Sequence, residues 1–71
     1  MKHERFERIL NLRIDNDLSQ SKLAKELNIS QRAYSHYESG SRSIPIEILV
    51  QLANYYDTSI DFLVGRTDKK K

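Results

Sequence analysis

One short segment of the sequence carries four polar side chains that share a face if the segment is helical: Gln31, Arg32, Ser35 and His36. A glutamine can form two hydrogen bonds with the edge of adenine, and an arginine can do the same with guanine. Serine and histidine donate or accept as the partner requires. These side-chain types suit the reading of base edges, although a polar face on a short helix is usually only solvated. The interpretation therefore depends on the elements that would hold this face.

The same residues offer little to catalysis or metal binding. Ser35 and His36 are adjacent, and neighbouring side chains on a helix do not face each other. The chain has no cysteine and only two histidines, His3 and His36, which are too few ligands for a structural zinc site. No carboxylate pair or phosphate-binding loop stands out in the sequence. We therefore predict that the protein is not an enzyme and uses no cofactor or metal, and no small-molecule ligand is evident from the sequence.

The polar face belongs to the second of two short helices that residues 18–42 predict. Two helices of about eight residues are joined by a three-residue turn, so they must approach closely. Ala24 is small where the helices would cross, and Asn28 tolerates the left-handed backbone that such a turn needs. Tyr34 and Tyr37 would anchor the second helix from behind. This is the pattern of a helix-turn-helix, which holds its second helix in the major groove of DNA.

Apolar residues recur at helical spacing along nearly the whole chain, and strand alternation is absent from the sequence. We predict an all-α fold, a compact five-helix bundle in which the second and third helices form the helix-turn-helix. The inward positions are expected to be Phe6, Ile9, Leu10, Leu12, Arg13 and Ile14, then Leu23, Ala24 and Leu27, then Ala33, Tyr34 and Tyr37, then Leu49, Leu52, Ala53 and Tyr56, with residues 60–64 as the last helix. The expected boundaries are residues 15–17, Asn28, Gly40, Pro45 in the first turn of the fourth helix, Ser59 and Gly65.

Length and charge narrow the class of protein further. At 71 residues the chain forms one domain, and we expect residues 1–65 to be that domain and residues 66–71 to be a basic, disordered tail. Eight basic and six acidic residues precede position 43, whereas no basic residue lies between Arg42 and Arg66. This asymmetry favours an anionic partner for the first half. The charged start excludes a signal peptide and the apolar runs are too short to span a membrane, so a cytoplasmic protein is expected.

Polar residues beside the two helices are suited to the DNA backbone. Ser19 and Ser30 would cap the two helices, whose first backbone N–H groups favour phosphate oxygens. Gln20 follows the first cap and lies near enough to assist the base-reading face. A short polar loop after the second helix would lie along the sugar-phosphate backbone. Its residues are Ser39, Ser41, Arg42 and Ser43.

Several short pieces of the chain match one known family in a single register. They are Leu12-Arg13, Leu18-Ser19-Gln20, Leu23-Ala24, Ile29-Ser30, Ser35, Tyr37-Glu38, Gly40, Arg42, Pro45, Leu49, Leu52-Ala53 and residues 59–65. With these pieces, from Phe6 through Gly65, the sequence resembles the Cro/XRE family of phage-repressor-like helix-turn-helix domains. Two residues depart from the family pattern. Asn28 stands where glycine is most common, and Ile46 stands where some relatives carry a basic residue that reaches toward the minor groove, so no minor-groove contact is expected there.

The resemblance implies a lambda-repressor-like fold that binds operator DNA, usually as a dimer, and regulates transcription. We therefore expect a sequence-specific regulator of double-stranded DNA, a repressor, that pairs as a homodimer on two half-sites about one helical turn apart. It would be a bacterial or phage-encoded, nucleoid-associated protein. The resemblance also implies individual roles: base reading by Gln31, Arg32 and His36, a position near the backbone for Ser35, a phosphate contact for Gln20 that braces the first reading residue, and an ion pair between Arg13 and Glu38.

A second class of function stays open at this point. Residues 44–64 carry only acidic charges, together with the aromatic side chains of Tyr55 and Tyr56 and the apolar Val64. Such a surface could hold a protein partner, as in an antitoxin, or a second copy of the chain. Co-purification of a second polypeptide would separate this protein-interaction alternative from DNA binding.

Overall fold

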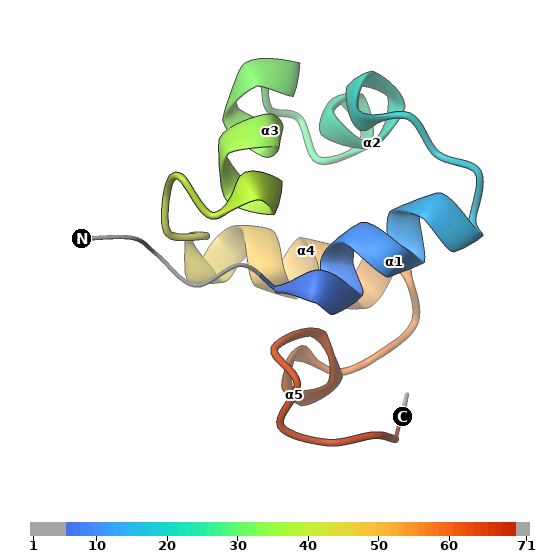
Figure 1. Cartoon of the computed structure of the whole chain (residues 1–71). Coiled ribbons are helices and arrows are strands. Elements are labelled where there is room, and N and C mark those ends of the chain that lie inside the picture. Colours follow the sequence, from blue (N-terminus) through green and yellow to red (C-terminus); the bar gives the residue numbers. More distant parts are fainter. Residues whose placement is uncertain (1–5, 70–71) are drawn as a thin grey trace.

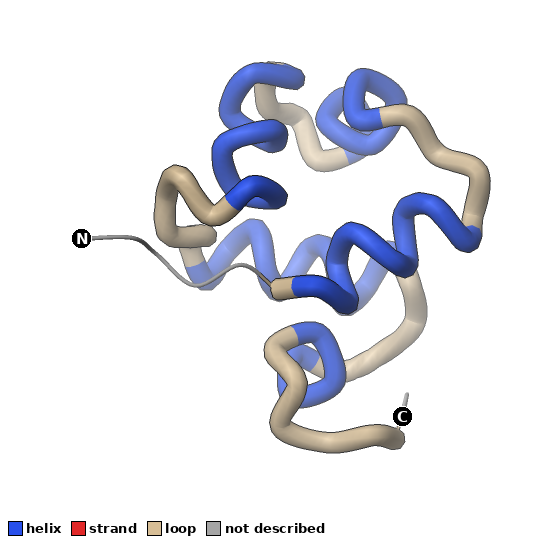
Figure 2. The backbone as a smooth tube through the Cα atoms, in the orientation of Figure 1, coloured by secondary structure: helices blue, strands red, loops and turns tan. Residues whose placement is uncertain are grey.

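The computed structural model describes residues 6–69. Residues 1–5 and 70–71, which include His3 and the end of the expected tail, lie outside the described residues. Within residues 6–69 all regular structure is helical (Figure 2), as predicted. The helices are α1 (Glu7–Asp15), α2 (Gln20–Glu26), α3 (Gln31–Ser39), α4 (Ile46–Tyr55) and α5 (Ile60–Leu63). None of these helices is long and apolar enough to cross a membrane.

The helices are arranged around a central pair. Figure 1 shows α1 running in front of α4 across the middle of the molecule, with α2 and α3 on one side of this pair and α5 on the other. α2 packs against α3, while α1 contacts both α3 and α5. The helix-turn-helix formed by α2 and α3 therefore occupies one end of the domain, as the sequence predicted.

Serine hydroxyls begin three of the helices. The side-chain oxygens accept from the backbone N–H three residues further on, at 3.1 Å for Ser19 and at 3.0 Å for Ser30 and Ser59. Each bond satisfies a backbone donor that has no partner within the helix. Pro45 differs from the prediction, because its ψ of 148° is extended and it precedes the helix as the N-cap; α4 begins at Ile46.

Residues in the left-handed conformation end the helices. Asn28 (φ 61°) lies in the turn between α2 and α3, and Gly40 (φ 83°) follows α3, as predicted. Asp17 (φ 55°) and Asp57 (φ 54°) adopt the same conformation after α1 and α4, which a short polar side chain tolerates. The sequence predicted a turn near Asp17 but did not single out Asp57. The turn between α2 and α3 comprises residues 27–30, slightly longer than expected, because Leu27 caps α2 instead of continuing it.

The helices share a single core. Ile9, Leu23, Tyr34, Leu52 and Leu63 are each at most 1% exposed, and each comes from a different helix. Full burial of one such side chain contributes about 1.5–3 kcal/mol. Because every helix supplies one of these residues, the orientation of the helix-turn-helix is fixed by the same packing that stabilises the whole domain.

Two positions in the predicted apolar faces differ from expectation. Ile14 was expected to face inward, but it is 54% exposed. At 3.6 residues per turn it lies about 140° around α1 from the buried Ile9, so it cannot share that face. Ile48 was not singled out, yet it is only 6% exposed. It precedes Leu52 by four residues and therefore lies on the same face of α4.

The segment after α5 contacts α1 through the side chain of Arg8, as far along the chain as Asp68. The expectation of a disordered tail over residues 66–71 stays a prediction. The Nη1 atom of Arg8 donates to the backbone oxygens of Phe62, at 3.2 Å, and Thr67. Its Nη2 atom lies 2.7 Å from Asp68 Oδ1, and the guanidinium sits 4.4 Å from the centre of the Phe62 ring. Arg8 of α1 thus connects the first helix to the last helix and to the segment that follows it.

Candidate nucleic-acid interface

The four polar side chains singled out in the sequence line one shallow hollow on the outside of α3. The hollow has a volume of about 470 Å³, and its residues, which we call the α3 face, are Gln31, Arg32, Ser35 and His36. The first two are exposed and the last two are half-buried. A different side of the same helix is buried through Tyr34 and Glu38. α3 therefore presents a polar face to solvent while its inner side is fixed by the core.

The turn before α3 explains how the sequence sets this orientation. Ala24 is 1% exposed, and its backbone oxygen accepts from the N–H of Ile29 at 3.0 Å. Asn28 supplies the left-handed residue that lets the chain reverse at this point. Ile29 is half-buried and packs against the core between the two helices. A small residue, a left-handed residue and an apolar residue in succession therefore define the angle at which α3 leaves α2.

A buried carboxylate joins α3 to α1 and α2. Glu38 is 6% exposed, and its Oε2 accepts from Arg13 Nε at 2.8 Å and from the Tyr34 hydroxyl at 2.6 Å. Its Oε1 accepts from Arg13 Nη2 at 3.1 Å and from Gln20 Nε2 at 3.0 Å. We call these four residues the Glu38 cluster. The resemblance implied the ion pair with Arg13 but not the other two donors, for which the only sequence signal is the four-residue spacing between Tyr34 and Glu38.

The ionisation of the Glu38 cluster follows from these bonds. Burial acts to raise the pKa of Glu38, but the hydrogen bonds from Arg13, Tyr34 and Gln20 and the charge of Arg13 outweigh it, so this pKa lies below its ordinary value of 4.5. The hydrogen bond to Glu38 raises the pKa of Arg13. Burial, together with the bond to Glu38, raises the pKa of Tyr34. At neutral pH the cluster therefore contains a charged pair and a protonated phenol that donates to it.

The residues predicted to contact the DNA backbone adjoin the α3 face in two places. Ser19 and Ser30 lie at the starts of α2 and α3, where their hydroxyls act as caps. At the end of α3, the hydroxyls of Ser39 and Ser41 lie 2.9 Å apart, and the Arg42 N–H donates to the His36 backbone oxygen at 3.2 Å. This bond folds the loop back toward the last turn of α3. Ser39, which was expected on the loop, is instead the last residue of α3; it is exposed, as are Ser41, Arg42 and Ser43 on the loop itself.

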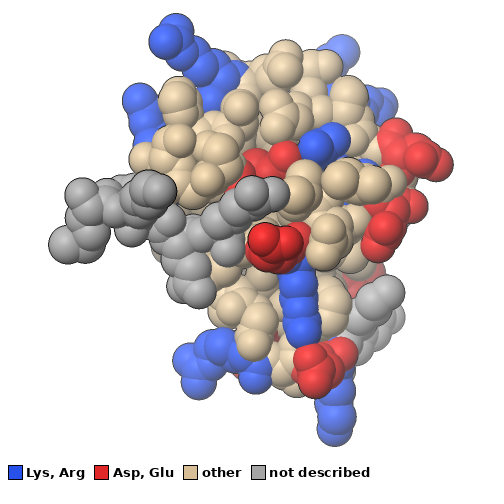
Figure 3. All heavy atoms as spheres, viewed as in Figure 1, with Lys and Arg blue, Asp and Glu red and all other residues tan. Residues whose placement is uncertain are grey.

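Basic side chains outnumber acidic ones in the part of the chain that forms α2 and α3. Figure 3 shows Lys and Arg side chains projecting around this end and also around α5, whereas Asp and Glu side chains gather toward the end of α1. Residues 18–42 carry four basic and two acidic side chains, and one of the acidic ones, Glu38, is buried and paired. Residues 43–65 carry three acidic side chains and no basic one. The surface around the α3 face is therefore the part suited to an anionic partner.

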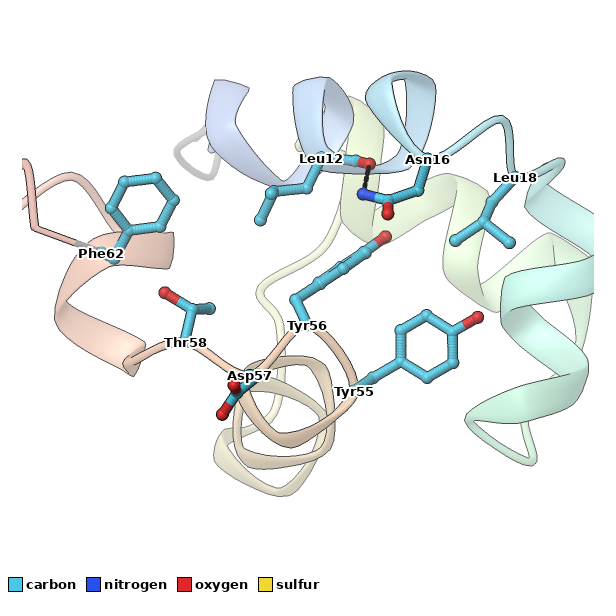
Figure 4. Close-up of a pocket in the computed structure, with 8 residues that line it drawn as sticks. All are labelled: Leu12, Asn16, Leu18, Tyr55, Tyr56, Asp57, Thr58 and Phe62. Atoms are coloured by element: carbon cyan, nitrogen blue, oxygen red, sulfur yellow. Dashed lines mark hydrogen bonds between the residues drawn. The ribbon is translucent and has the colours of Figure 1, made fainter. Parts of the chain in front are cut away.

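A second hollow lies between the ends of α1 and α4 and the start of α5, apart from the α3 face. It has a volume of about 450 Å³ (Figure 4) and is lined by Leu12, Asn16, Leu18, Tyr55, Tyr56, Asp57, Thr58 and Phe62. The rings of Tyr55 and Tyr56 meet edge to face with centres 5.2 Å apart. Within residues 6–69 the buried Tyr56 hydroxyl finds no hydrogen-bond partner, and burial raises the pKa of Tyr56 to about 12. None of the residues predicted to contact DNA lines this hollow.

Replacing Tyr56 with phenylalanine is expected to raise the free energy of unfolding by about 1 kcal/mol. The substitution keeps the ring and removes a hydroxyl that is shielded from water without a partner in the described structure. Urea unfolding followed by circular dichroism measures the change. Tyr34→Phe is the matched control and should destabilise the protein, because the hydroxyl of Tyr34 donates to Glu38. A lower unfolding midpoint for Tyr56→Phe would mean that its hydroxyl has a partner in solution.

This architecture and site define a compact all-α domain whose second and third helices form a helix-turn-helix. A comparison with known protein families matches residues 9–63 to the helix-turn-helix family. The chain belongs to this family, and the names of its relatives, HTH-type transcriptional regulators and phage transcriptional repressors, agree with the Cro/XRE resemblance seen in the sequence.

Individual relatives agree with this assignment. The chain is 37% identical over 62 residues to YobD, an uncharacterized HTH-type transcriptional regulator of Bacillus subtilis, which covers 87% of this chain and 55% of the relative. It is 40% identical over 60 residues to RstR, a cryptic phage CTXphi transcriptional repressor of Vibrio cholerae, and the alignment covers 84% of this chain and 54% of RstR. The structure superimposes on the crystal structure of a transcriptional regulator from Listeria innocua with a TM-score of 0.81 and 33% identity, covering 97% of this chain and 64% of the other. This chain thus spans little more than half the length of YobD and RstR.

Proposed function

We propose that this chain binds double-stranded DNA in a sequence-specific manner and regulates transcription, with α3 in the major groove. The observation that carries the proposal is the α3 face, where four base-compatible side chains line one hollow on the exposed side of the second helix of a helix-turn-helix. A major groove about 12 Å wide admits a helix of this kind. The relatives described above, which are named transcriptional regulators and repressors, support the proposal.

Each residue has a defined role in the proposed complex. Gln31, Arg32 and His36 read base edges, and Ser35 lies near the sugar-phosphate backbone. The start of α3 contributes backbone N–H groups, which favour phosphate oxygens. The loop after α3 follows the backbone on the other side of the face. The residues proposed to position the DNA backbone are Ser19, Gln20, Ser30, Ser39, Ser41, Arg42 and Ser43.

The proposal extends to the assembly and its setting. Two copies of the chain would bind two half-sites separated by about one helical turn, roughly 34 Å, and act as a repressor at the nucleoid in the cytoplasm. The proposal assigns no catalytic step to any residue. The relatives above bear the names of transcriptional regulators and repressors, so the antitoxin alternative draws no support from them.

Selection of duplexes from a random pool tests the proposal directly. The full chain is incubated with the pool at moderate salt, and bound duplexes are separated by gel shift and sequenced over several rounds. We expect enrichment of one motif with two-fold symmetry and a spacing of about one helical turn between its halves. Enrichment of no sequence, together with weak binding to every duplex, would refute sequence-specific binding.

Replacing Arg32 with alanine is expected to weaken binding to the selected site by about 1–3 kcal/mol per half-site and to relax the preference at one base position. Arg32 is exposed on the α3 face, where its guanidinium can form two parallel bonds with one base. Arg32→Lys is the control, because it keeps the charge but loses the two-bond geometry. Fluorescence anisotropy against a set of single-base variants measures both effects. Uniform weakening on all variants would make Arg32 a phosphate contact instead.

A further inference from the structure

Gln20 connects the proposed DNA surface to the Glu38 cluster. It is the first residue of α2 and is half-buried. Its Nε2 atom donates to Glu38 Oε1 at 3.0 Å, and the same oxygen accepts from Arg13 Nη2 at 3.1 Å. The other oxygen of Glu38 is occupied by Arg13 Nε and the Tyr34 hydroxyl. Arg13, Gln20 and Tyr34 therefore each donate at least one hydrogen bond to the same carboxylate, and Gln20 is the member that also belongs to the proposed interface.

The charge of Glu38 dictates which way the amide of Gln20 points. A carboxylate only accepts hydrogen bonds, whereas an amide has a donating nitrogen at one corner and an accepting oxygen at the other. Rotating the amide by 180° would place its oxygen against Glu38 Oε1 and leave a buried carboxylate with one donor fewer. Such an arrangement is costly where water is excluded. Gln20 is therefore restricted to one orientation before any DNA arrives.

We propose that Glu38 is a positioning residue for DNA binding that acts through Gln20, by fixing the amide so that its carbonyl oxygen and one remaining N–H are presented in a single orientation. The inference rests on the proposed function and adds to it a residue that touches no DNA itself. A side chain ordered in advance binds more tightly than one that must select its orientation on binding. The ion pair with Arg13 holds the scaffold together, whereas the bond to Gln20 serves recognition.

The orientation can be tested in the free protein by NMR. In the ¹⁵N spectrum of the full chain, the side-chain amide protons of Gln20 should shift in step with the protonation of Glu38 as the pH is lowered below 4.5. Exposed Gln51 provides the internal reference, and its amide should not follow that transition. A Gln20 amide that is insensitive to the titration of Glu38 would overturn the proposal. This measurement uses the unmodified chain, so it does not depend on whether any variant folds.

A double-mutant cycle in DNA binding tests the functional step. Gln20→Ala, Glu38→Gln and the double variant are compared by anisotropy on the selected duplex, at a temperature where circular dichroism shows each to be folded. Gln20→Ala should weaken binding by about 2- to 12-fold per half-site, the equivalent of one hydrogen bond. Glu38→Gln should weaken it to a similar extent, and the double variant should bind no more weakly than Gln20→Ala. Additive weakening would show that Glu38 acts elsewhere and would overturn the proposal.

Tyr34→Phe is the matched control for a merely structural role. It removes a donor from Oε2 of Glu38 and leaves the Oε1 bond to Gln20 in place. We expect it to lower stability but to keep the dissociation constant of the folded protein within about 2-fold of the wild type. Weakening as large as that of Glu38→Gln would also overturn the proposal. If the wild-type chain selects no DNA, the proposed function fails and this inference with it; if the wild type binds and the cycle is additive, only this inference fails.

Discussion

Replacing Glu38 with alanine is expected to lower the free energy of unfolding by about 3–5 kcal/mol. The substitution leaves the guanidinium of Arg13, whose side chain is only 16% exposed, without its counter-charge. It also removes the acceptor for the Tyr34 hydroxyl and the Gln20 amide. A domain of this length is stable by about 4–10 kcal/mol in total, so the variant should lose a large fraction of its stability. Urea and thermal unfolding by circular dichroism measure the loss.

The pair between Arg8 and Asp68 is the control for this prediction. Its N–O distance is 2.7 Å, close to the 2.8 Å of the Arg13–Glu38 pair, but the side chain of Asp68 is 98% exposed. Exposed ion pairs add little to stability because solvent screens them. Asp68→Ala should therefore leave the unfolding midpoint nearly unchanged. If the two variants lose equal stability, burial of the Glu38 cluster is not what makes it important.

The carboxylate of Glu38 should make the free energy of unfolding depend on pH, which tests independently whether this carboxylate stabilises the fold. The pKa of Glu38 in the folded chain lies below its ordinary value of 4.5. Its contribution to stability is therefore complete above that value and is lost as the pH falls through the folded pKa. The stability difference between the wild type and Glu38→Gln should shrink below pH 4.5 and stay constant above it. A difference that is the same at every pH would contradict this assignment.

Helix caps and turns, which depend on residues close together in the sequence, were predicted well. Ser30 caps α3 through a bond to a residue three positions on, and Asn28 and Gly40 adopt positive φ where the chain must turn. These outcomes depend on local chemistry, so residue type and spacing are enough to predict them. The helix-turn-helix and the common face of Gln31 and His36 follow from the same local rules.

Apart from the Arg13–Glu38 ion pair, which the family resemblance implied, contacts between residues far apart in the sequence were missed, because periodicity contains no information about them. Arg8 bonds Thr67 and Asp68 across more than fifty positions, a contact that the sequence did not indicate. Gln20 and Glu38 are eighteen positions apart, and only the angle between α2 and α3 brings the amide to the carboxylate. The contacts of the α3 face with DNA depend on a second molecule, so they stay predictions.

Raising the salt concentration from 50 to 200 mM is expected to weaken binding to the selected duplex by about 10³- to 10⁵-fold. This range corresponds to about 6–10 phosphates neutralised per dimer, each of which releases condensed counterions when a basic side chain replaces them. The surface around the α3 face offers such groups in Lys22, Lys25 and Arg42, all exposed. Anisotropy titrations across this salt range give the slope of log K, the logarithm of the binding constant, against the logarithm of the salt concentration. A slope near zero would show that the chain binds DNA without neutralising its backbone.

A pair of arginine variants can show whether the slope arises from direct phosphate binding or from overall charge. Arg42→Ala removes a charge from the loop after α3, and the slope of log K against log salt should fall by about 0.9 for each phosphate that is no longer neutralised, about 1.8 for two half-sites. Arg66→Ala removes the same charge beyond α5, where the side chain is 79% exposed. Its slope should match the wild type, because a charge more than a Debye length from the DNA, about 10 Å at 0.1 M salt, is screened. Equal decreases in both variants would mean that the net charge, and not the loop after α3, governs binding.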